Sequence, residues 1–473
     1  MEMSRRAAGK ALLATAAAGI PGQAAESSLR RLPEERLGTQ VCVVGGGSAG
    51  IGAALAAARA GAKVVLLERE SVLGGTSTMA WVHTWEPCSG ADGIPRDLYD
   101  AMKREPSAVV EPDYSKGAPR RGGSPLPFEP RALSFAAREM LDATGRCQVL
   151  LATTFCHARV EGARIAAVDA VFCGKRLTVE ADVFIDCTAD GDACADAGCA
   201  FHIGEDPKSR YGEPSAPEKA GLHLNGLTLL YRIADSGTPQ KPHLPKGIRR
   251  GLCPRPTCIR PLPNGDLLLN PVDMIDGNAV VHADYSRLMR DAHHRVLEHF
   301  HWLQTAIGSP ADAPGTMRRH IPEKGFATWT IAGIAPRIGV RESRRILGDA
   351  TLTEHDCQAG VRKQKHPDII AVTDHAVDIH GAKGRLYEVP NGPYGIPYRC
   401  LLPRGVENLM IASRAASFSH IAASSCRLSR TMITLGQAAG TAAALAVQNG
   451  VPPRKVDIAA LQTALTKQRV ALS

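Results

Sequence analysis

Three glycines and a glutamate near the start of the chain have the types and the spacing that dinucleotide binding requires. Gly45, Gly47 and Gly50 follow an apolar run, and Glu68 ends a second apolar run about 20 residues further on. The first glycine permits a tight turn, the second lets the backbone approach a pyrophosphate, and the third lets a helix pack closely on a strand. A carboxylate at Glu68 can bind both ribose hydroxyls and disfavours a 2′-phosphate. The pattern predicts a dinucleotide site, with a purely structural turn as the alternative.

The segments around these residues predict the elements that must position them. Residues 41–44 and 64–67 are apolar and typical of buried strands, and the alanine-rich stretch up to about Arg59 is typical of a helix. Ser48 and Ala49 fall in the first turn of this helix, where backbone N–H groups and the helix dipole favour phosphate. Because strand, glycines, helix, strand and acidic residue occur in register, we expect a Rossmann-like unit.

Composition limits the class of protein. The 473 residues are 44% hydrophobic and 22% charged, which is typical of a globular protein with more than one domain. The net charge of +9 is spread along the chain, so we expect no nucleic acid partner, although anionic substrates are compatible with it. Beyond the N-terminus no run reaches the ~18 apolar residues of a membrane span, so no stable span is expected.

Residues 1–30 are typical of an export signal. Arg5 and Arg6 precede a weakly apolar run at 11–20, and small residues follow at a cleavable position. The segment resembles a twin-arginine signal, although Ala8 and Gly9 replace the bulky residues usual there. The sequence therefore predicts a periplasmic or extracellular protein exported with its cofactor bound, and a membrane anchor or a disordered tail is the alternative.

The cysteines and one histidine-rich stretch offer no clear metal or redox centre. Thirteen cysteines are scattered without a C-x-x-C pair, so we expect mostly buried free thiols and leave one bridge open. His294, Glu298 and His301 share one face of an expected helix at 284–307, as metal ligands would. No further ligand completes such a site, so we expect no metal and interpret them as solvated or packed side chains.

The rest of the chain divides into a nucleotide domain and an insertion. Short β-runs at 148–154, 158–160, 165–173 and 176–180 predict an antiparallel meander, and residues 181–189 predict another buried strand. Residues 201–330 carry many prolines, polar loops and the long helix, which predicts a separate α+β substrate or cap domain. Apolar and alanine-rich segments return after residue 331.

With these motifs in order, the chain resembles the FAD-dependent oxidoreductase family of the glutathione-reductase-like flavoproteins over about residues 38–450. The motifs are the glycine turn, Gly74-Gly75-Thr76, FIDCTADGDACADAG at 184–198, RESRRILG at 341–348, GIPYRCLLP at 395–403 and the segment from ENLMIASRAAS to LGQAAGTAAALA. The resemblance implies an α/β fold: a Rossmann-like FAD domain with a central parallel sheet and a β-meander at 38–200 and 331–450, an inserted α+β domain at 201–330, and a C-terminal helix at 451–473.

The resemblance also implies an FAD site. Cys156, with His157, is expected beside the adenine. Ser413 and Arg414 are expected beside the ribityl and pyrophosphate region, and Gly436–Thr441 at the start of a helix whose positive end faces the flavin; simple domain closure is the alternative for this last segment. The complete set of expected cofactor contacts is Gly45, Gly47, Ser48, Ala49, Gly50, Glu68, Arg69, Gly74, Gly75, Thr76, Cys156, Ala189, Asp190, Ser413, Arg414, Gly436, Gln437, Gly440 and Thr441.

No second G-x-G-x-x-G unit follows, so we expect no nicotinamide domain. The expected reaction is hydride transfer from a small organic substrate to flavin N5, with reoxidation by oxygen or an external electron acceptor. Two alternatives remain: a flavin-dependent lyase or isomerase, and a binding protein with a vestigial FAD site. The protein is expected to be a monomer or homodimer.

The expected catalytic residues are two histidines and two arginines. His420 and His380 are candidates for the base or for a substrate donor, with a packed histidine as the alternative. Arg399 or Arg427 is a candidate for clamping a substrate carboxylate. His83 is a weaker candidate. The charged run Arg341, Glu342, Arg344 and Arg345 is expected to form a buried ion-pair lattice between domains.

Overall fold

The computed structural model describes residues 33–86, 89–110, 126–248, 257–271, 274–278, 284–313, 320–380, 386–388 and 390–473. The expected export signal and Cys253 lie outside these ranges, as does most of the Pro- and Gly-rich segment at 105–130. Within the described residues, no helix is both long enough and apolar enough to cross a membrane.

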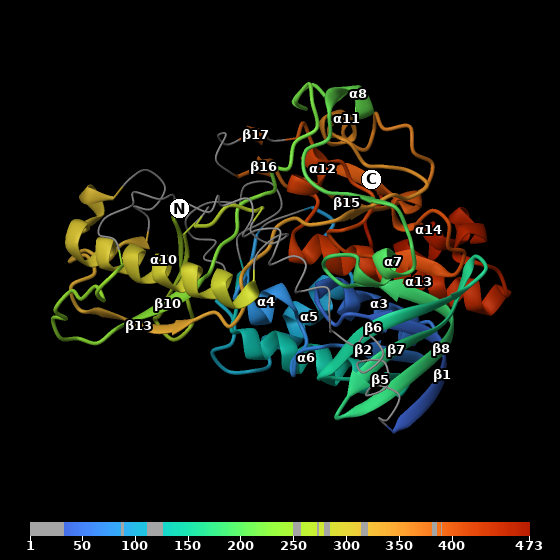
Figure 1. The fold of residues 1–473 in the computed structure, drawn as a ribbon, viewed down its shortest axis with the longest axis horizontal. Coiled ribbons are helices and arrows are strands. Elements are labelled where there is room, and N and C mark those ends of the chain that lie inside the picture. Colours follow the sequence, from blue (N-terminus) through green and yellow to red (C-terminus); the bar gives the residue numbers. More distant parts are fainter. Residues whose placement is uncertain are drawn as a thin grey trace, which may run out of the picture.

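The described part of the chain begins with the predicted nucleotide-binding unit (Figure 1). Strand β1 (Glu34–Val44) leads into helix α3 (Ser48–Arg59), which leads into strand β2 (Val64–Leu67). β1 lies between β2 and β8 (Lys175–Asp186), parallel to both. β5 (Cys147–Leu150) pairs parallel with β2, and β19 (Leu409–Ile411) pairs parallel with β8, so both extend the same sheet. The expected central parallel sheet is therefore confirmed.

The β-meander consists of β6 (Thr153–Glu161), β7 (Arg164–Phe172) and β8, paired antiparallel. The sequence predicts two strands at 176–180 and 181–189, whereas the structure has the single strand β8. Residues 175–180 of β8 pair with β7, and residues 184–186 pair with β19 along the same edge. One long strand thus belongs to both the meander and the parallel sheet, which the local sequence pattern does not reveal.

Helix α13 (Ser429–Asn449) packs against α3 and is almost wholly buried. A Cβ at Gly436 would lie 1.9 Å from the carbonyl oxygen of Ala49, and one at Gly440 would lie 2.1 Å from that of Ala53. Only glycine permits this approach of the two backbones. The prediction that this helix starts near Gly436 is wrong, because the helix begins at Ser429.

A second hydrophobic core extends from Leu227 to Ile338. It joins helix α10 (Tyr285–Ala306) to a four-stranded sheet in the order β11-β12-β10-β13, with bounds Thr257–Pro261, Leu267–Pro271, Tyr231–Asp235 and Trp329–Ile334. In Figure 1, α10, β10 and β13 lie at the left and the nucleotide-binding sheet lies at the lower right. Residues 201–226 do not contribute to it; β9 (Phe201–His202) instead pairs with β14 (Arg345–Ile346).

The histidines of α10 have different surroundings. His299 is buried, with Nδ1 2.6 Å from the hydroxyl of Tyr231 and Nε2 3.1 Å from that of Thr257. Glu298 forms an ion pair with Arg295 at 2.9 Å, and His294 is exposed. The described residues contain no cluster of three or more potential metal ligands. The eleven cysteines in the described ranges are unbridged, and most of them are buried.

The remaining elements connect or cover these two cores. The helices and 3-10 turns are α4 (Thr76–Met79), α5 (Ile94–Met102), α6 (Pro130–Asp142), α7 (Asp192–Asp196), α8 (Lys208–Tyr211), η2 (Pro310–Asp312), α11 (Glu354–Ala359), η4 (Tyr398–Leu401), α12 (His420–Ser425), η5 (Pro453–Lys455) and α14 (Ile458–Lys467). The strands are β3 (Thr84–Trp85), β4 (Leu126–Pro127), β15 (Ile369–Thr373), β16 (Val377–Ile379), β17 (Leu386–Glu388) and β18 (Tyr394–Pro397).

Candidate functional site

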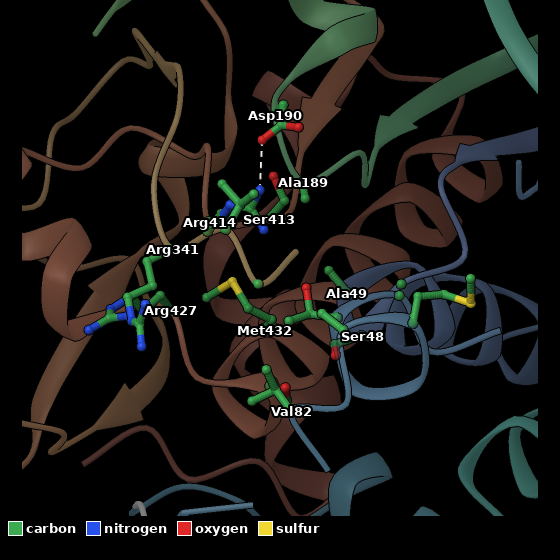
Figure 2. A pocket seen from close by; sticks show the side chains of 18 of the residues that line it. Ser48, Ala49, Val82, Ala189, Asp190, Arg341, Ser413, Arg414, Arg427 and Met432 are labelled. Carbon is green, nitrogen blue, oxygen red and sulfur yellow. Dashed lines mark hydrogen bonds and ion pairs between the residues drawn. The ribbon is translucent and has the colours of Figure 1, made fainter. Parts of the chain in front are cut away.

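A cavity of about 1620 Å³ is lined by residues of both cores. Its volume exceeds the roughly 300–1,000 Å³ of an ordinary small-molecule pocket, so it has room for more than one small ligand. Its walls come from the β1–α3 turn, the ends of β2 and β8, the second sheet, and the start of α13. Figure 2 shows the side chains of 18 of the lining residues from close by, with ten of them labelled.

The glycine turn forms one wall of the cavity. Gly45 has a φ of +101°, and a Cβ there would lie 2.8 Å from the carbonyl oxygen of Cys187, the residue after β8. Gly47 is the N-cap of α3. A Cβ on Gly75 would lie 2.9 Å from the Cα of Gly47. The open backbone and the N-terminus of α3 give a cradle for phosphate.

Glu68 follows β2 and is buried. Its carboxylate accepts hydrogen bonds from the backbone N–H groups of Gly46 at 2.6 Å and Glu70 at 2.8 Å. Burial raises the pKa of Glu68, and these two N–H groups oppose the rise. The side chain is therefore fixed at the cavity wall, at the predicted ribose position.

Residues after β8 form a further wall. Asp186 ends the strand and accepts hydrogen bonds from the backbone N–H groups of Thr188 at 2.9 Å and Cys194 at 2.8 Å. Burial raises the pKa of Asp186 to about 6. Asp190 accepts a hydrogen bond from Arg414 at 2.7 Å (Figure 2). Burial acts to raise the pKa of Asp190, but Arg414 and the hydroxyl of Ser343 together outweigh this and lower it.

The N-terminus of α13 is the second helix start at the cavity. Leu428 caps the helix, and Ser429, Arg430 and Met432 line the cavity. The positive end of the helix dipole is therefore presented by residues 428–432 and not by Gly436–Thr441.

The sequence profile described as FAD dependent oxidoreductase matches residues 40–465. The chain belongs to this family. FAD is therefore its cofactor. No curated protein matches the sequence.

Solved structures give a more distant likeness. A geranylgeranyl bacteriochlorophyll reductase-like protein from Thermoplasma acidophilum is 13% identical, with a TM-score of 0.45 over 92% of this chain and 85% of that one. The p-nitrophenol 4-monooxygenase of Pseudomonas putida is 12% identical, with a TM-score of 0.45 over 92% and 89%. A myxobacterial chondrochloren halogenase is 13% identical, with a TM-score of 0.44 over 92% and 79%.

In this FAD-dependent oxidoreductase most of the expected cofactor contacts line the cavity. They are Gly45, Gly47, Ser48, Ala49, Glu68, Arg69, Gly75, Thr76, Cys156, Ala189, Asp190, Ser413 and Arg414. A cradle of glycines, a fixed carboxylate and two helix N-termini fit a cofactor with a pyrophosphate and a ribose. Gly50, Gly74, Gly436, Gln437, Gly440 and Thr441 lie behind this wall. Gly50 and the four residues of α13 are buried in helix packing, so they support the wall without lining it.

Two of the four expected catalytic residues line the cavity and the other two do not. His380 and Arg427 line the cavity. Arg399 lies outside it and forms an ion pair with Asp368 at 3.0 Å. His420 is also outside it: its Nδ1 lies 2.8 Å from Glu342, so His420 belongs to the ion-pair lattice and not to the cavity.

The lattice is centred on Glu342. Its carboxylate contacts Arg345 at 2.6 Å, His420 at 2.8 Å and the side-chain amide of Asn225 at 2.9 Å. Burial would raise the pKa of Glu342, but the neighbouring His420 and Arg345 lower it to about 2. Arg344 forms a half-exposed pair with Asp192 at 2.8 Å, and both Arg344 and Arg341 line the cavity. The expected buried lattice is confirmed for Glu342 and Arg345, whereas Arg341 and Arg344 lie at the cavity wall.

Two further histidines line the cavity. His83 is fully buried, and its Nδ1 lies 2.6 Å from the carbonyl oxygen of Phe128. Burial lowers the pKa of His83 and of His375 to about 4 in each case, so both rings are neutral at pH 7. From sequence, His83 is only a weaker candidate and His375 is absent from the expected set. A histidine outside any motif carries no signal of its burial.

We expect the His83→Asn variant to be less sensitive to mild acid than the native protein. The folded-state pKa of His83, about 4, lies below its ordinary value of 6.5. Its contribution to stability is therefore fully present above pH 6.5 and is lost as pH falls from 6.5 toward 4, because the unfolded chain binds the proton first. One proton changes the free energy of unfolding by about 1.4 kcal/mol per pH unit. Between pH 6.5 and 5 the free energy of unfolding should therefore fall by about 1–2 kcal/mol less in the variant than in the native protein.

Urea unfolding of the FAD-loaded protein at several pH values measures this difference. Asparagine can keep the hydrogen bond to Phe128, so the change isolates titration. His294→Asn, at an exposed position on α10, is the control and should leave the pH dependence unchanged. If the free energy of unfolding falls equally with pH in the native protein and in His83→Asn, the low pKa assigned to His83 is contradicted.

Proposed function

We propose that this FAD-dependent oxidoreductase oxidises a small organic substrate by hydride transfer to the flavin, with oxygen or an external electron acceptor completing the cycle. The observation that carries the proposal is the continuity of one cavity from the glycine turn and Glu68 to residues of the second core, such as Thr228, Leu230 and Leu268. When bound, FAD supplies the electron-accepting ring system.

In this proposal the glycine turn and the N-terminus of α3 hold the pyrophosphate, Glu68 holds the ribose, and the start of α13 faces the flavin. The second core acts as the substrate or cap domain. Its buried strands would exclude water from the space above the flavin. We extend the proposal to export of the folded, FAD-loaded protein as a monomer or homodimer.

His380 is the proposed acceptor of the substrate proton. Its Nε2 lies 2.7 Å from the carboxylate of Asp378, and its backbone N–H donates to the side chain of Asn225 at 3.0 Å. Its side chain is 6% exposed. A carboxylate bonded to one ring nitrogen fixes the orientation of the imidazole, which general base catalysis requires.

Anaerobic flavin reduction tests the proposal. Purified protein reconstituted with FAD is mixed with sugars, hydroxy acids, amino acids and amines, and the loss of the oxidised flavin absorbance is followed. We expect at least one class of substrate to bleach the flavin. The His380→Asn variant should retain FAD and bleach about 10²- to 10⁴-fold more slowly.

His294→Asn is the matched control and should bleach at the native rate. Protein that binds no FAD after reconstitution, or bound flavin that no tested class reduces, would overturn the proposed reaction. A native bleaching rate in His380→Asn would remove only the assignment of the proton acceptor.

A further inference from the structure

Two arginines lie next to each other in the wall of the cavity, Arg341 and Arg427 (Figure 2). Arg341 belongs to the segment that returns from the second core, and Arg427 directly precedes the N-terminus of α13. The positive end of α13 therefore adds to the charge of the two guanidinium groups.

Backbone oxygens hold both guanidinium groups in place. Nη1 of Arg341 donates to the carbonyl oxygen of Gly226 at 2.5 Å and to the hydroxyl of Thr228 at 2.9 Å. Nε of Arg427 donates to the carbonyl oxygen of Ser424 at 2.7 Å, and its Nη2 donates to that of Asp378 at 2.9 Å. These hydrogen bonds fix the orientation of both guanidinium groups, so both groups are preorganised.

The two like charges oppose each other in a buried place. Burial and the neighbouring charge of Arg341 together lower the pKa of Arg427 to about 10, although Asp378 and Glu342 act against this. Asp378 lies 3.8 Å from Arg427 but only 2.7 Å from His380, and Glu342 contacts Arg345 and His420. An anionic ligand group bound at the two guanidinium groups would offset their repulsion.

We infer that Arg341 and Arg427 form a carboxylate subsite and that the substrate is a small carboxylic acid. The planar guanidinium fork matches a carboxylate in a bidentate contact. The same Asp378 contacts Arg427 and His380, so a carboxylate held here lies near the proposed proton acceptor. This inference rests on the proposed function and narrows its substrates to acids such as hydroxy acids and amino acids.

Anaerobic calorimetric titration of the FAD-loaded protein tests the subsite by ligand binding, in the absence of the oxygen or electron acceptor that turnover needs. The probes are lactate, glycolate and benzoate, each compared with its primary amide. We expect the native protein to bind at least one acid at least 10-fold more tightly than its amide. Arg341→Gln and Arg427→Gln should each weaken that acid by about 10- to 100-fold. Arg427→Lys keeps the charge but lacks the planar guanidinium, so its affinity for the acid should lie between those of the native protein and Arg427→Gln.

Arg399→Gln is the control, because Arg399 lies outside the cavity, and it should bind the acid with native affinity. Equal affinity for acids and amides, or native acid binding in both cavity variants, would overturn the inference. If both variants lose FAD while their acid binding is unchanged, the arginines contact the cofactor and not the substrate, and the inference is also overturned. Bleaching of the flavin by uncharged substrates alone would also overturn the subsite while leaving the proposed reaction intact.

Discussion

Replacing Glu342 with alanine is expected to lower the free energy of unfolding by about 3–5 kcal/mol. The substitution removes the anion from a site where Arg345 is 2% exposed and His420 is 4% exposed. Asp206 would remain 3.0 Å from Arg345, but His420 would lose its carboxylate partner. Arg345 would then depend on Asp206 alone for a carboxylate partner, and Asp206 also pairs with Arg210 at 2.6 Å. An incompletely compensated buried charge is costly, so the loss should be large.

Urea unfolding at pH 7 of the native protein and Glu342→Ala measures this effect. Asp291→Ala, which breaks the exposed pair with Arg287 on α10, is the control and should cost no more than about 1 kcal/mol. The folded-state pKa of Glu342, about 2, lies below 4.5, so its contribution is present above pH 4.5 and is lost as pH falls toward 2. A loss below about 1 kcal/mol at pH 7 would show that the lattice does not stabilise the fold.

The sequence predicts the nucleotide-binding wall well because its signals are local. The glycines, the two apolar runs and Glu68 lie within one short segment, and the structure places them at one end of the cavity. Glycines at a tight strand-to-helix turn, followed by a carboxylate at the next strand end, form a pattern specific to dinucleotide binding. The same reasoning predicts α10 closely, because the helix expected at 284–307 is found at Tyr285–Ala306.

The rest of the cavity and the ion-pair lattice are harder to predict because their residues come from distant segments. His420 and Glu342 are 78 positions apart, and only the fold reveals that they are partners. The charged run at 341–345 looks uniform in sequence, yet Arg345 is buried in the lattice while Arg341 lines the cavity. The start of α13 is equally hidden, because residues 429–435 contain neither proline nor glycine to mark a boundary.

Replacing Gly440 with valine is expected to destabilise the protein by more than about 3 kcal/mol and to release FAD. A Cβ at Gly440 would lie 2.1 Å from the carbonyl oxygen of Ala53 and 2.9 Å from its carbonyl carbon. Helix α3 would have to move away from α13, and the N-terminus of α3 carries the phosphate cradle. The crowding at Gly440 is therefore expected to weaken FAD binding indirectly, by displacing α3.

Two further variants distinguish this packing role from the direct cofactor contact that the sequence suggests for Gly440. Alanine normally stabilises a helix by about 1 kcal/mol relative to glycine, so a loss of about 1–3 kcal/mol in Gly440→Ala would report the crowding. Gly38→Val, where a Cβ meets no atom within 4 Å, should change stability by no more than about 0.5 kcal/mol. Thermal unfolding and FAD content are measured for each protein, with and without added FAD. If Gly440→Ala weakens FAD binding but leaves the stability of the FAD-free protein unchanged, Gly440 acts at the cofactor and the packing argument fails.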